Sequence, residues 1–76
     1  MENIELTKSL IAHEAIIVHG DDVPEGYIDI AHGSFGENEV TIAIPENLLE
    51  TPYLINKLAN DAVSCILKAM KLFGSK

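Results

Sequence analysis

Residues 27–44 read YIDIAHGSFGENEVTIAI and contain two runs in which apolar and polar side chains alternate. In residues 27–31 and again in residues 39–44, the large β-branched side chains fall on one face. Alternation with a period of two is typical of strands that are half buried against another layer. The segment between the runs, residues 32–38, contains two glycines and predicts the loop of a β-hairpin over about 27–44. The inward-facing residues of this hairpin would be Ile28, Ile30, Val40, Ile42 and Ile44.

The last third of the chain has the pattern of one long helix. Thr51 and Pro52 are typical of a helix start, with threonine as N-cap and proline at the first helical position. Up to Phe73, polar residues recur at intervals of three and four and form one solvent-facing stripe: Lys57, Asp61, Ser64, Lys68 and Lys71. The opposite face is apolar and wide, so the helix over about 52–73 needs a sheet or another helix to cover it. Pro45 ends the preceding strand, and residues 45–50 predict a single helical turn.

The N-terminal third allows two interpretations. Residues 4–12 predict a short helix, and the β-branched run at residues 16–18 favours a third strand over about 14–19. A single helix that continues to residue 18 is the alternative. Residues 19–26 hold two glycines, a proline and paired aspartates, and predict a loop.

Together these elements predict an α+β fold. A small antiparallel sheet would pack its isoleucine face on the amphipathic C-terminal helix, with a short N-terminal helix beside it. The 76 residues suit a single domain, residues 1–76. Each large side chain buried in such a core contributes roughly 1.5–3 kcal/mol before entropy is counted.

Composition limits the setting and the partners. The lone cysteine, Cys65, cannot form an intramolecular disulfide and fits a reducing compartment. The N-terminus lacks the basic and apolar regions of a secretory signal, and no apolar run reaches the roughly 18 residues of a membrane span. We therefore expect a cytoplasmic protein that does not contact membranes.

Charge is divided unevenly along the chain. Residues 1–50 hold eleven of the twelve carboxylates and one cation, Lys8, whereas residues 51–76 hold four lysines and one carboxylate, Asp61. The chain contains no arginine, and its formal net charge is −7. Affinity for nucleic acid comes largely from lysine and arginine at the phosphates, so direct binding of nucleic acid is not expected.

None of the residue clusters that suggest chemistry has the required spacing. His13, His19 and His32 are separated by six and thirteen positions, which does not match paired zinc ligands. The acidic loop at residues 21–25 lacks the alternating oxygen ligands of a calcium loop. Ser34 follows His32-Gly33 rather than standing in the Gly-x-Ser-x-Gly elbow of a hydrolase. We predict no catalytic residue, no metal ligand and no cofactor, and we do not expect an enzyme.

The carboxylates are the remaining candidates for a site. Those on the strand face opposite the isoleucines, together with those in the flanking loops, would form one negative surface that docks on a basic partner protein. The residues assigned to this partner-binding surface are Asp21, Asp22, Glu25, Asp29, Glu37 and Glu39. An inhibitor that imitates the phosphates of nucleic acid on a nucleic-acid-binding protein would have this character, as small acidic proteins of phages and mobile elements do. Solubility alone is the simpler explanation of the same charge.

The alternative function is a self-associating structural or adaptor module. The apolar face of the C-terminal helix is wider than a small sheet covers, so a homodimer through this helix is the second hypothesis. Its contacts would be Leu54, Ile66, Met70 and Phe73.

Overall fold

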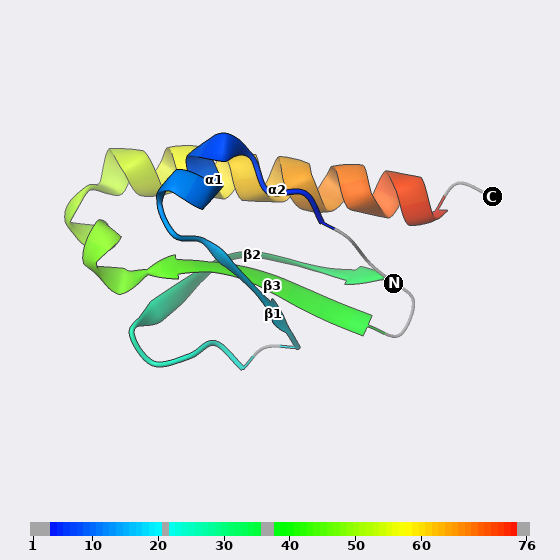
Figure 1. Cartoon of the computed structure of the whole chain (residues 1–76), viewed down its shortest axis with the longest axis horizontal. Coiled ribbons are helices and arrows are strands. Elements are labelled where there is room, and N and C mark those ends of the chain that lie inside the picture. The colour runs from blue at the N-terminus through cyan, green and yellow to red at the C-terminus, as the bar shows by residue number, and fades with distance from the viewer. Residues whose placement is uncertain (1–3, 21, 36–37, 75–76) are drawn as a thin grey trace.

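A computed structural model describes residues 4–20, 22–35 and 38–74. In chain order the elements are α1 (Lys8–Ala12), β1 (Ile16–His19), β2 (Tyr27–Phe35), β3 (Asn38–Pro45), the 3-10 helix η1 (Glu46–Glu50) and α2 (Pro52–Gly74). Both α-helices lie on one side of a three-stranded sheet, and the segment between β1 and β2 passes on the other side (Figure 1). The predicted α+β fold with a long C-terminal helix is confirmed.

The sheet order places the last strand in the middle. β3 pairs with β1 on one side and with β2 on the other, antiparallel in both cases. β1 and β2 therefore run in the same direction, and the connection between them, described at residues 20 and 22–26, must cross β3. Both ends of this crossing are glycines with left-handed backbone angles, Gly20 at φ 80° and Gly26 at φ 92°. We call the sheet face away from α2, which this crossing covers, the outer face.

The chain turns from helix to strand at residues 13–15. The backbone N–H of Ala15 donates to the Leu10 carbonyl, and that of Glu14 donates to the Ile11 carbonyl. Glu14 lies in the left-handed region at φ 61°, so these bonds form the Schellman C-cap of α1. The alternative of one helix to residue 18 is wrong. Residues 4–6 are also not helical, because the extended Thr7 is the N-cap and its hydroxyl accepts from Leu10 N–H at 3.3 Å.

The hairpin is longer than predicted. Residues 32–35 belong to β2 and residue 38 to β3, so the expected loop over 32–38 is wrong for these positions. The register shifts between Asp29 and Ala31, which marks a β-bulge at Ile30. The sequence pattern predicts Gly33 in the hairpin loop, yet this glycine lies within β2 opposite Val40. A Cβ built on Gly33 would lie 2.5 Å from Ile66 Cγ2, so glycine here admits α2 close to the sheet.

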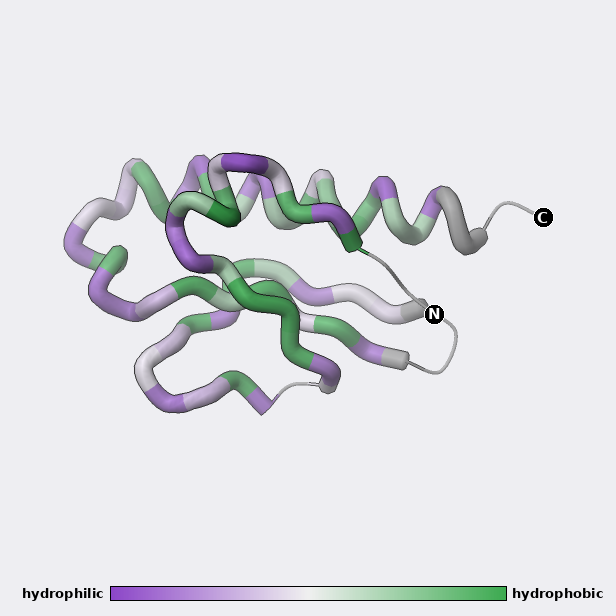
Figure 2. Tube along the Cα trace, viewed as in Figure 1, coloured by the Kyte–Doolittle hydropathy of each residue, from purple (hydrophilic) through white to green (hydrophobic). Residues whose placement is uncertain are grey.

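The core lies between the sheet and the helices. β3 contributes Val40, Ile42 and Ile44, and α1 contributes Leu10, all of them buried. The buried face of α2 consists of Leu58, Ala62, Cys65, Ile66 and Ala69. Ile28 and Ile30 of the edge strand pack against this cluster but are only partly buried. Apolar residues are concentrated in β1 and in the middle of β3 (Figure 2).

Candidate functional site

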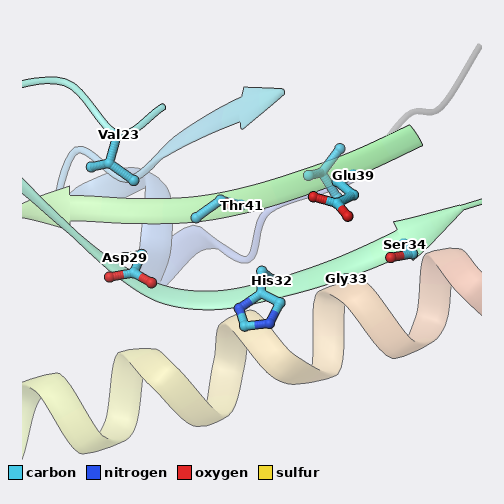
Figure 3. Close-up of a pocket in the computed structure, with 8 residues that line it drawn as sticks. Val23, Asp29, His32, Gly33, Ser34, Glu39 and Thr41 are labelled. Atoms are coloured by element: carbon cyan, nitrogen blue, oxygen red, sulfur yellow. The ribbon is translucent and has the colours of Figure 1, made fainter. Parts of the chain in front are cut away.

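The outer face carries polar side chains from two neighbouring strands. Asp29, His32 and Ser34 are spaced along β2, while Glu39 and Thr41 lie on β3 (Figure 3). Asp29 is paired with Ala43, and Ser34 is paired with Glu39. Four residues of β3 therefore separate the levels of the two carboxylates, which corresponds to roughly 13 Å along the strand. Asp29 and Glu39 thus lie at the two ends of one row of polar side chains.

The bulge at Ile30 creates this row of polar side chains. With strict alternation, Asp29 would share a face with Ala31 and Gly33. The extra residue instead puts Ala31 opposite Ile42 and His32 opposite Thr41. Asp29 and His32 consequently face the same side of the sheet.

The crossing segment covers part of the outer face. The Thr41 hydroxyl donates to the Gly20 carbonyl at 2.7 Å, which ties the start of this segment to β3. Thr41 and Ala43 are buried, at 4% and 0% exposure, although the strand face opposite the isoleucines is expected from the sequence to form an open negative surface. That expectation was wrong because the order β1-β3-β2 forces the chain to cross over them.

Beside the crossing segment remains a cavity of about 610 Å³. Among the described residues, the side chains that define its character are Val23, Asp29, His32, Ser34, Glu39 and Thr41. Asp29, His32, Ser34 and Glu39 are exposed, and Thr41 forms the buried floor. In the part of the chain that the structure describes, two carboxylates and no lysine line the cavity, so it suits a positively charged group.

Four of the six assigned carboxylates fall on or beside the outer face. Asp29 and Glu39 line the cavity, and Asp22 and Glu25 are exposed in the crossing segment on either side of Val23 and Pro24. Asp21 and Glu37 lie outside the described residues. Whether any of these six residues binds a partner stays a prediction.

The other charged side chains lie elsewhere on the molecule. The described lysines are all helical: Lys8 in α1, and Lys57, Lys68 and Lys71 in α2. Some carboxylates are also outside the outer face, at both ends of α1, in η1 and on α2: Glu5, Glu14, Glu46, Glu50 and Asp61. The acidic residues therefore do not all share one side, but the lysines and the outer-face carboxylates are on opposite layers.

His32 and Ser34 belong to this surface, although the sequence pattern predicts a loop at their positions. The signal was the adjacent apolar pair Ile30-Ala31, which breaks the period of two and indicates a bulge. Ser34 stands in an ordinary strand rather than at the sharp strand-to-helix turn of a nucleophile elbow.

The histidines are separated in space as well as in sequence. His13 closes α1, where its Nδ1 lies 2.8 Å from the Ser9 carbonyl, His19 ends β1, and His32 faces the cavity. Within residues 4–20, 22–35 and 38–74, no group of three or more histidine, cysteine or acidic side chains is arranged to hold a metal ion. Cys65 is buried in the core on the sheet-facing side of α2.

No protein-family model matches the chain, and no curated protein or solved structure is significantly similar to it. Over the described residues, no helix combines the length and apolarity that crossing a bilayer demands.

Proposed function

We propose that this protein binds a positively charged surface of a partner protein through the outer face of its sheet. The observation that carries this proposal is the cavity between Asp29 and Glu39, which lies on the layer opposite the helical lysines. Solubility requires net charge, but it does not require carboxylates at both ends of a recess.

The geometry suits lysine or arginine side chains of the partner. A cationic head group that enters the recess meets a carboxylate toward either end, with the His32 ring between them and the Ser34 hydroxyl beside Glu39. Asp22 and Glu25 on the crossing segment add negative charge at the rim. Such rim charges raise the rate of encounter more than they raise final affinity.

A more specific function of this kind is inhibition, in which the protein replaces nucleic acid on a DNA-binding protein. Residues on one face of a strand recur about every 6.8 Å, and Asp29 and Glu39 are separated by roughly 13 Å, about four nucleotide rises of 3.4 Å along one DNA strand. The two carboxylates would therefore take the places of two phosphates that are several nucleotides apart.

The test is a salt titration of binding to a panel of basic DNA-binding proteins, with a duplex oligonucleotide as competitor. We expect binding that weakens steeply as salt rises, because screening acts over about 10 Å at 0.1 M. The inhibitor form predicts that the oligonucleotide and this protein exclude one another. Binding that is insensitive to salt, or the absence of binding across the panel, contradicts the proposal.

A further inference from the structure

The second surface of interest combines the edge strand β2 with an exposed apolar stripe on α2. Val63, Leu67 and Met70 follow one another at intervals of four and three, and they are 45%, 58% and 40% exposed. This spacing puts all three on one face of the helix, away from the core residues Leu58 and Ala62. The stripe is therefore a second apolar face, distinct from the face that covers the sheet.

The stripe lies beside the sheet edge that β2 forms. The sulfur of Met70 would be 3.8 Å from a Cβ on Gly33, so this end of the stripe sits directly above β2. In the described sheet, β2 pairs with β3 on one side only, whereas α1 and β1 occupy the other flank of the molecule. The edge and the stripe thus form one continuous strip.

β2 lacks most of the devices that protect edge strands from pairing. Its nine residues, Tyr27–Phe35, include neither lysine nor proline, and Asp29 is its one charged residue. Asp29 faces the outer side, away from the helical stripe. The bulge at Ile30 interrupts only the first half, which leaves Ala31–Phe35 regular.

We propose that a second copy of this chain covers the strip, in a two-fold dimer in which β2 pairs antiparallel with β2 of the other copy. The apolar stripes of the two α2 helices then meet above the joined edge. A self-pairing strand needs no complementary partner sequence, and an isologous contact places each Leu67 near its symmetry mate.

The size and charge of the strip favour an identical copy over a charged partner. The five regular residues Ala31–Phe35 span about 17 Å, and the strand with the helix above it is about 20 Å deep, since layers stack about 10 Å apart. The resulting patch of roughly 340 Å² is less than half of the roughly 800 Å² that each side of a standard interface buries, so we expect a weak dimer that forms at high micromolar concentration. Lys71, one helical turn after Leu67, borders the stripe, and Asp29 faces the outer side, so a basic or acidic partner would find few charges on the strip to recognise.

The residues of α2 that are available for self-association differ from those that the sequence predicts. Ile66 is buried at 4% exposure beneath its own sheet, and Leu54 packs partly against the core, so neither is free for a partner. Met70 remains in the strip, and the Phe73 side chain lies outside the described residues. Val63 and Leu67 take the places of Leu54 and Ile66.

Sedimentation equilibrium on the full chain tests the dimer. We expect a mass of twice 8.3 kDa at high micromolar concentration. Leu67→Lys should weaken dimerisation about a hundredfold, because each dimer loses two buried leucines and buries two ammonium groups. Ile11→Lys is the matched control, since Ile11 is 62% exposed on α1, and it should leave the dimer intact. A monomer at this concentration, larger species, or equal effects of the two variants would overturn the proposal.

Two further readouts separate this proposal from the partner-binding function, on which it does not depend. Amide exchange in β2 should be slower in the dimer than in Leu67→Lys at equal concentration; equal exchange would refute pairing through β2. Added salt should strengthen self-association between chains of net charge −7, whereas it should weaken binding to a basic partner.

Discussion

Adding one methyl group at Gly33 should destabilise the fold, and a second substitution should cancel much of that effect. The Cβ of Gly33→Ala would lie 2.5 Å from Ile66 Cγ2, about 1 Å closer than an ordinary contact between carbon atoms. Overpacking of this kind costs about 1–3 kcal/mol. For a domain of this size, each kcal/mol lowers the Tm by about 4–8 °C.

The substitution at Ile66 identifies the cause. Ile66→Ala removes Cγ2 and should cost about 2–5 kcal/mol alone, since the side chain is almost fully buried. In the double variant, the new methyl group occupies space that Cγ2 has left. The cost of the double variant should therefore be about 1–3 kcal/mol smaller than the sum of the two single costs.

Urea denaturation of the four proteins in this double-mutant cycle measures the coupling. Ile66→Val is the matched control, because valine keeps both γ-carbons and should leave the cost of Gly33→Ala unchanged. Additive effects in the Ile66→Ala background, or a neutral Gly33→Ala, would show that glycine is not required there for close approach of α2.

Three other substitutions test local features of the fold by the same denaturation assay. Glu14→Gly should stabilise the fold by about 0.5–1 kcal/mol. The left-handed conformation costs a residue with a side chain about 1–2 kcal/mol, and glycine loses part of this gain because it is more flexible in the unfolded chain. Glu14→Ala should give no gain, and a gain equal to that of glycine would mean that removal of the charge is the cause. Thr41→Val should cost about 0.5–1.5 kcal/mol by removing the hydrogen bond to the Gly20 carbonyl, and amide exchange at residues 22–26 should rise; unchanged exchange would separate this bond from the position of the crossing segment. Ile42→Ala should cost about 2–5 kcal/mol at a fully buried site, and an unchanged Tm would place the core elsewhere.

The elements were predictable where the pattern of side chains was regular. The stripe from Lys57 to Lys71 located α2, and the alternation around Ile42 located β3. The break between helix and strand near residue 14 was also predicted, from the β-branched run alone. Its cause, a left-handed glutamate in a Schellman cap, is not a preference that the residue type reveals.

The outer face was less predictable because two tertiary features shape it. The bulge at Ile30 reverses the facing of His32 and Ser34, and the sheet order β1-β3-β2 brings the crossing segment over Thr41 and Ala43. Neither feature follows from local periodicity. Gly33 shows the same limit, since a glycine that admits a helix and a glycine that makes a turn look alike in the sequence.

Binding by charge-matched variants tests the role of the outer face most directly. The double variant Asp29→Asn/Glu39→Gln neutralises the two carboxylates of the cavity, and Glu46→Gln/Glu50→Gln neutralises two exposed carboxylates of η1, so both proteins carry the same net charge. Against a basic protein that the wild type binds at low salt, the cavity variant should lose about tenfold or more in affinity, while the η1 variant changes much less. Equal losses would mean that net charge alone drives the interaction and that the outer face is not the binding site.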